Sequence, residues 1–157
     1  MARMSAIICV IIFLSSQAIG QTIGVKIGTL YDPNYREFVT QRLEVSFSKP
    51  ILQDVDVTIA TGLLTAMARV NSGYAIPLTG GLKYTFLHSV VAPYCGLEYG
   101  GILFVRRNSH SRMGPEFKAG LGIQYPLQDK LLLDVSTKLL MEDGFAYELM
   151  AGIRFRL

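Results

Sequence analysis

The sequence predicts an all-β protein, an eight-stranded antiparallel up-and-down transmembrane β-barrel. Three observations predict it: apolar and polar residues alternate with a period of two after residue 20, turn-forming residues separate the alternating runs, and the polar faces carry balanced charge. A length of 157 residues is typical of one domain. Half of the residues are apolar and only 17% are charged, which excludes a disordered chain.

Residues 1–20 have the pattern of a cleaved signal peptide. Arg3 supplies the basic start, the apolar run Ala6–Leu14 is too short to span a bilayer, and Ala18 and Gly20 place small residues before a cut at Gln21. No other continuous apolar run is present, which excludes a multi-span helical membrane protein. Residues 21–157 then form the barrel domain, and Cys95 remains as its single cysteine, so an internal disulfide is excluded.

Eight runs with a period of two follow one another in the mature chain. Short connections rich in Pro, Gly, Asn and Asp separate them, which favours antiparallel neighbours. The expected strands are Ile23–Tyr31, Arg36–Ser48, Asp54–Arg69, Tyr74–Phe86, Ala92–Val105, Pro115–Tyr125, Lys130–Met141 and Phe145–Leu157.

Each expected strand has one apolar and one polar face. In the last strand, Leu149, Ile153 and Phe155 alternate with Glu148 and Arg154. In a membrane barrel the apolar face contacts lipid and the polar face lines the lumen. Alternation shows which residues share a face, but not which face is outside. A soluble periplasmic calycin-like barrel, with its apolar face around an apolar ligand, therefore remains an alternative.

The polar faces carry equal numbers of basic and acidic residues. A closed interior needs this balance, because an unpaired buried charge is costly and a paired one is tolerated. Side chains can fill the interior of an eight-stranded barrel, so we expect a plugged lumen with a charge network of Lys26, Arg42, Glu44, Asp54, Asp56, Lys83, Glu98, Glu116, Lys118, Asp134, Lys138, Glu148, Arg154 and Arg156.

The C-terminal half carries a resemblance to a known family. The segment Ile76–Phe86, the Pro-Tyr-x-Gly motif at Pro93–Gly96 and the Gly-x-Gly strand at Gly120–Gly122 occur in the order found in small porin-like, opacity-type (OmpA/OmpX-like) outer-membrane barrels. The chain end also resembles the assembly signal of these proteins, with Gly152 followed by Phe155 and Leu157. The resemblance implies an eight-stranded barrel in the Gram-negative outer membrane, inserted by the barrel-assembly machinery.

No catalytic, metal or cofactor site is expected. An outer-membrane lipid-modifying enzyme is a further alternative, since lipid A deacylases carry a His-x-Ser motif on a strand, but His88 and His110 lack this spacing. One cysteine and two distant histidines form no metal site. Arg106, Arg107 and Arg112 are candidate contacts for lipopolysaccharide phosphates.

These observations predict a non-enzymatic protein that serves envelope structure or surface interaction through its outer loops. We expect its partners to be outer-membrane lipid, lipopolysaccharide and, during insertion, the barrel-assembly machinery. A net charge of +3 without a basic run gives no support for nucleic acid as a partner, and we expect a monomer.

Overall fold

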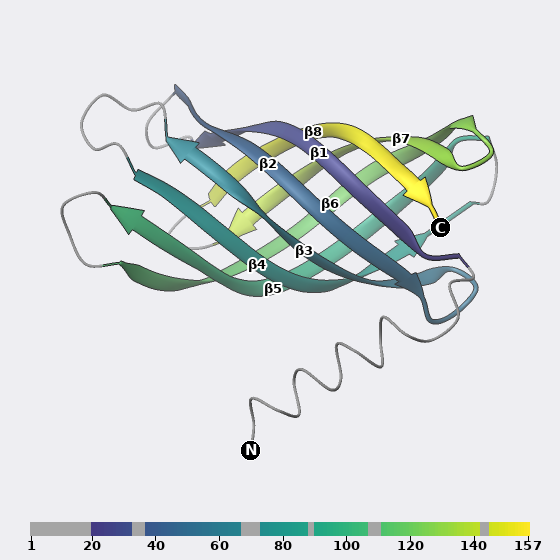
Figure 1. Cartoon of the computed structure of the whole chain (residues 1–157), viewed down its shortest axis with the longest axis horizontal. Helices are drawn as coiled ribbons and strands as arrows, with labels where there is room; N and C mark the ends of the chain where they lie inside the picture. Colours follow the sequence, from purple (N-terminus) through teal and green to yellow (C-terminus); the bar gives the residue numbers. More distant parts are fainter. Residues whose placement is uncertain (1–19, 33–36, 67–72, 88–89, 107–110, 142–144) are drawn as a thin grey trace, which may run out of the picture.

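The computed structural model describes residues 20–32, 37–66, 73–87, 90–106, 111–141 and 145–157 (Figure 1). The signal peptide predicted for residues 1–20 lies almost wholly outside the described residues. The described chain contains no helix long and apolar enough to cross a membrane. Its strands are β1 (Thr22–Asp32), β2 (Glu37–Pro50), β3 (Val55–Ala66), β4 (Gly73–Thr85), β5 (Ala92–Arg106), β6 (Arg112–Gln128), β7 (Leu131–Met141) and β8 (Phe145–Arg156).

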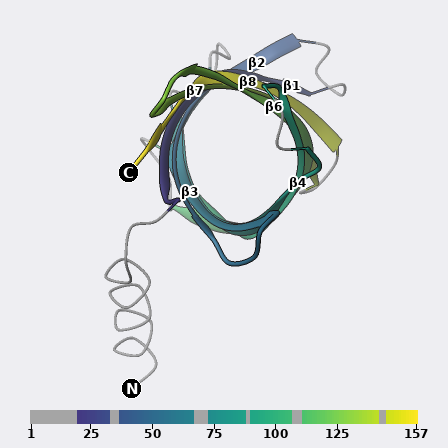
Figure 2. The same ribbon diagram turned by 90° about the vertical axis from the view of Figure 1, so that its right-hand side faces the viewer.

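The strands form one closed barrel. Each strand pairs antiparallel with the next, and β8 pairs with β1, so that the strands surround a single axis (Figure 2). The predicted eight-stranded up-and-down barrel is confirmed. We call the end where β1 ends and β2 begins the loop end, and the end that carries the C-terminus the turn end (Figure 1).

β2 and β6 extend by two or more residues beyond their predicted bounds. β2 continues to Pro50, and the turn after it closes with hydrogen bonds from the Ile51 and Leu52 amides to the Val55 carbonyl. β6 begins at Arg112 instead of Pro115, because residues 112–114 continue the pairing with β5. Gly114 and Pro115 favour a loop in the sequence, but the hydrogen-bonded pairing with β5 keeps residues 112–114 in the strand.

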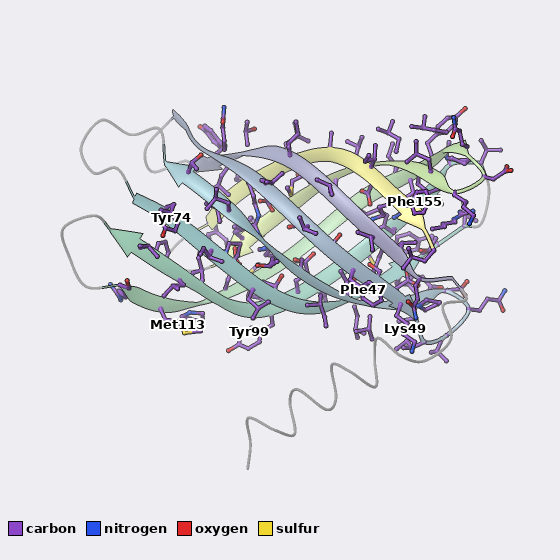
Figure 3. The ribbon with its side chains drawn as sticks, in the orientation of Figure 1. Phe47, Lys49, Tyr74, Tyr99, Met113 and Phe155 are labelled. Carbon is purple, nitrogen blue, oxygen red and sulfur yellow. The ribbon has the colours of Figure 1, made fainter. Side chains whose placement is uncertain are left out.

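Side chains alternate between the two faces of the barrel wall as the period of two predicts. Leu78, Tyr99 and Leu121 are at least 60% exposed on the outside, whereas Lys26 and Asp134 are at most 2% exposed inside. The aromatic side chains of Tyr74, Tyr99 and Phe155 project from the outer surface in Figure 3. The apolar face is therefore outside, the opposite of the soluble calycin-like alternative.

The interior is not polar along its whole length. Leu64, Ala75 and Ile102 pack together inside the barrel near the loop end, where Leu140 is also buried. The charged side chains occupy the middle and the turn-end half. The buried charged side chains therefore lie in these two parts, and the layer near the loop end is apolar.

Candidate functional site

Large charged side chains inside the barrel lie beside glycines of the neighbouring strands. Glu44 of β2 pairs with Gly62 of β3, and Glu98 of β5 pairs with Gly81 of β4. A Cβ atom at either glycine would collide with the backbone of the paired strand. Alternation of large and small residues lets long side chains share the narrow lumen of a small barrel. The same arrangement pairs Arg42 with Gly28, Lys83 with Gly96, Lys138 with Gly120 and Arg154 with Gly24.

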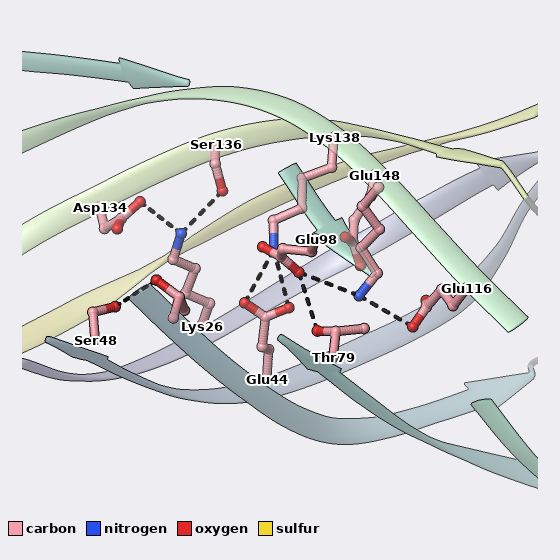
Figure 4. A network of polar contacts seen from close by, with 12 residues as sticks. Lys26, Glu44, Ser48, Thr79, Glu98, Glu116, Asp134, Ser136, Lys138 and Glu148 are labelled. Carbon is pink, nitrogen blue, oxygen red and sulfur yellow. Dashed lines mark hydrogen bonds and ion pairs between the residues drawn. The ribbon is translucent and has the colours of Figure 1, made fainter. Parts of the chain in front are cut away.

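Asp134 of β7 is the centre of the charge network near the turn end. Lys26 Nζ lies 2.7 Å from its Oδ1 atom, and the Arg154 guanidinium donates to Oδ2. The Tyr94 hydroxyl donates to Oδ1 at 2.7 Å, and the Gln124 amide donates to Oδ2 at 3.1 Å. Lys26 also donates to Ser136 at 3.1 Å (Figure 4). We call Asp134, Lys26, Arg154, Tyr94 and Gln124 the Asp134 cluster.

A second and larger group of charges fills the middle of the barrel. Arg42 lies 3.0 Å from Glu148, 3.2 Å from Glu116 and 3.5 Å from Glu44. Lys138 lies 2.8 Å from Glu98 and 3.2 Å from Glu44 (Figure 4). Lys118 completes the group at 3.3 Å from Glu116 and 3.7 Å from Glu98. We call these residues the Arg42 cluster: Arg42, Glu44, Glu98, Glu116, Lys118, Lys138 and Glu148.

The ion pairs of the Arg42 cluster are not all hydrogen-bonded. Within the described chain, Arg42 Nε, Lys118 Nζ, Glu116 Oε2 and both carboxylate oxygens of Glu148 are buried without a hydrogen-bond partner. Buried water is the usual partner of such atoms. An adjoining cavity of about 30 Å³, lined among others by Lys118, has room for roughly two water molecules.

Four positions of the predicted network lie outside these two clusters. Asp54 lies in the turn before β3, and Arg156 is exposed at the end of β8. Lys83 and Asp56 form their own ion pair, at 2.6 Å, towards the turn end.

Tyr94 is a polar interior residue that the sequence pattern did not single out. It is 7% exposed and lies opposite Gly122 of β6. A Cβ atom at Gly122 would overlap the tyrosine ring, so the glycine provides the space that Tyr94 occupies. Tyr94 and Glu98 are four residues apart in β5, so they lie on the same face of the strand. This spacing is the sequence feature that indicates an inward-facing Tyr94.

The fold is also found in solved structures of other proteins. No protein-family profile matches the chain, and no curated protein sequence matches it. Neisserial surface protein A (NspA) superposes with a TM-score of 0.69 at 12% sequence identity, over 87% of this chain and 96% of that protein. The N-terminal barrel domain of OprF from Pseudomonas aeruginosa has a TM-score of 0.63 at 15% identity, over 85% of this chain and 96% of that domain. The chain has the fold of a small outer-membrane β-barrel.

An enzyme shares this barrel fold. The outer-membrane enzyme PagL superposes with a TM-score of 0.56 at 10% identity, over 87% of this chain and 99% of that protein. The fold is therefore compatible with an enzyme or a non-enzymatic protein, and residues must distinguish them. His88 and His110 lie outside the described residues. The described part of the barrel holds no group of three or more His, Cys, Asp or Glu side chains arranged for a metal ion.

The residues of the predicted assembly signal lie on both faces of the wall. Gly152 points inward and lies between Lys26 of β1 and Asp134 of β7 in the strand register, where the missing side chain leaves room for their ion pair. Phe155 and Leu157 are 47% and 46% exposed.

The predicted lipopolysaccharide contacts are only partly described. Arg107 lies outside the described residues, as does the side chain of Arg106, whereas Arg112 is exposed at the start of β6.

Proposed function

We propose that the chain is a non-enzymatic integral outer-membrane β-barrel with a plugged, charge-paired lumen, which serves envelope structure or surface interaction through its outer loops. The observation that carries this proposal is the polarity of the wall: apolar side chains are exposed around the outside, and charged side chains pair inside. A bilayer offers no water to unpaired backbone groups, and a closed barrel pairs them between strands.

Side chains that fill the barrel interior support a structural role and argue against a diffusion pore. The Arg42 cluster and the Asp134 cluster occupy successive parts of the interior, and the cavity beside them has room for about two water molecules. Porins conduct through much wider barrels with water-filled interiors. We therefore expect no conductance steps from the purified barrel in a planar bilayer.

The proposal is tested by cell fractionation and gel mobility. We expect the mature protein in the outer membrane, with a compact band that shifts when the sample is boiled. A soluble periplasmic protein without a heat shift would contradict the proposal. Mass spectrometry of lipid A from cells that express the protein tests the non-enzymatic part, and we expect unchanged acyl chains.

A charge on the outer wall tests which face contacts lipid. Leu121 is 60% exposed in the middle of β6, and its replacement by lysine is expected to cost about 2–4 kcal/mol in a bilayer. Leu52→Lys is the matched control, because Leu52 is 66% exposed in the turn after β2, where a charge reaches water. Equal stability of the two variants in vesicles would refute the orientation.

Two partner interactions belong to the same proposal. In this proposal, the exposed Arg112 side chain at the loop end binds lipopolysaccharide phosphates, and the chain end with Gly152, Phe155 and Leu157 is recognised by the barrel-assembly machinery. Charge removal at Arg112 is expected to weaken lipopolysaccharide binding without a loss of the heat-modifiable band.

A further inference from the structure

The outer wall carries a row of polar side chains where the surrounding wall is apolar. The strand registers place Thr65 of β3, Gln41 of β2, Thr29 of β1, Leu149 of β8 and Thr137 of β7 side by side. All five are exposed, and all but Leu149 are polar. We call this set the outer polar row. The row crosses five neighbouring strands, whose order around the barrel is visible in Figure 1.

The polar groups of this row have no partner within the described chain. Within the described residues, no hydrogen bond is formed by the side chains of Thr29, Gln41, Thr65 and Thr137. Thr61, another outward threonine of β3, behaves differently, since its hydroxyl donates to the Pro77 carbonyl at 2.9 Å. A polar group that faces hydrocarbon without a partner is costly. The row therefore calls for hydrogen-bond partners from outside the chain.

A hollow in the wall coincides with this row. It measures about 260 Å³ and is lined by Thr29 and Tyr31 of β1, Thr137 of β7 and residues 147–149 of β8. Tyr31 and Tyr147 are cross-strand partners and form its loop-end border. An acyl chain that entered this hollow over Leu149 would pass between two threonine hydroxyls.

The depth of Thr29, in the middle of the row, matches the polar linkages of a lipid. Tyrosines near strand ends mark the membrane interface, and Thr29 lies two residues before Tyr31 along β1. With a rise of about 3.3 Å per residue and a strand tilt near 40°, Thr29 lies about 5 Å deeper than Tyr31. The row follows the hydrogen-bond direction and is therefore oblique to the membrane, so that its Thr65 end, paired with Tyr74, lies nearer the interface and its Thr137 end, paired with Leu121, lies deeper. Ester, amide and hydroxyl groups at the start of acyl chains lie at this depth, just below the headgroups.

The breadth of the row indicates which lipid it fits. Thr65 and Thr137 are four strand spacings apart, which is about 19 Å at 4.8 Å per spacing, measured along the oblique row around the curved wall of the barrel. A phospholipid has two ester groups close together, whereas lipid A carries ester, amide and hydroxyl groups on several acyl chains. Hydroxyl and amide side chains can both donate to and accept from these groups. Resting on the proposed outer-membrane location, we propose that the outer polar row and its hollow bind the hydroxyacyl region of lipid A.

The test is native mass spectrometry of the folded barrel in detergent, with added hexa-acylated lipid A or phosphatidylethanolamine. The variant is Thr29→Val/Gln41→Leu/Thr137→Val, which removes polar groups but keeps the side-chain sizes similar. Thr61→Val is the matched control, because the Thr61 hydroxyl is already bound within the chain. We expect the variant to bind lipid A about tenfold more weakly, equivalent to about 1.4 kcal/mol, and Thr61→Val to bind like the wild type.

Several outcomes would overturn this inference. Equal lipid A binding by wild type and variant would show that the row is not the site. Equal binding of lipid A and phosphatidylethanolamine to the wild type would remove the selectivity, and a dimer mass lost in the variant would make a second copy the occupant. The heat-modifiable band shows whether each variant folds as an outer-membrane barrel, independently of whether it binds lipid A. Thr137→Val alone is a milder variant, for which we also expect weaker lipid A binding.

Discussion

Replacement of Asp134 by asparagine tests whether paired charges hold the barrel interior together. Asp134 is fully buried and accepts hydrogen bonds or ion pairs from Lys26, Arg154, Tyr94 and Gln124. Asparagine keeps the size of the side chain but leaves two buried cations without their acid. The loss of one partner from a buried ion pair costs about 3–5 kcal/mol, so we expect the free energy of unfolding to fall by this amount.

Asp56→Asn is the matched control for this experiment. Asp56 contacts Lys83 at 2.6 Å, but its side chain is 23% exposed. Water reaches this pair from the Asp56 side, whereas Asp134 is fully buried, so we expect a smaller loss than for Asp134→Asn. The comparison separates the effect of a buried charge from that of any Asp-to-Asn change.

Both variants are measured by urea unfolding of the barrel in lipid vesicles, followed by circular dichroism and by loss of the compact gel band. Lys26→Met in the Asp134→Asn background removes one of the uncompensated cations and should recover part of the stability. Losses below about 1 kcal/mol for both aspartate variants would refute the reasoning, because the interior would then tolerate unpaired charge.

Two further predictions use the same unfolding assay. Gly122→Ala should cost about 1–3 kcal/mol because the new Cβ displaces the Tyr94 ring, whereas Gly80→Ala should be nearly neutral, since its Cβ would meet only the Thr58 carbonyl, at 3.9 Å. Arg154→Asp should be strongly destabilising and partly rescued by Asp134→Arg, and the absence of any rescue would mean that the two side chains do not form a pair. The rescue is partial because Lys26 would then face an arginine at position 134.

The sequence predicts which side chains share a face, but not which of them meet. A period of two places Arg42, Glu116 and Glu148 on the polar faces of three strands. Their contact follows from the stagger of all eight strands, which brings Arg42 of β2 across the lumen to Glu116 of β6. Alternation within a strand carries no information on this stagger, so the ion pairs could not be assigned beforehand.

The apolar layer near the loop end differs from the sequence prediction for another reason. Leu64, Ile102 and Leu140 alternate in step with the inward-facing residues of their strands and are buried. The prediction of a polar interior rests on the charged residues of those faces and does not take these apolar ones into account. Leu64 is followed by Thr65 and Leu140 is preceded by Leu139, so local alternation weakens where these strands approach their ends. Each of them is an even number of positions from a charged inward-facing residue of its strand, so strict alternation places it inside.

The division of charge between the two clusters argues against selective ion passage. In the Asp134 cluster, Lys26 and Arg154 outnumber Asp134 by one charge. In the Arg42 cluster, Glu44, Glu98, Glu116 and Glu148 outnumber Arg42, Lys118 and Lys138 by one. The one excess positive charge and the one excess negative charge therefore balance within the lumen, and the Lys83–Asp56 pair adds no net charge.

Ion-selective pores instead present rings of one charge to the passing ion. In this barrel, an ion of either sign would have to separate existing ion pairs and then pass the apolar layer near the loop end. The charged side chains of the interior form ion pairs with one another, whereas the hydroxyls of the outer polar row have no partner within the described chain. Recognition of other molecules is therefore expected at the outer wall and the loops, where Thr29 and Thr137 lack partners within the described chain.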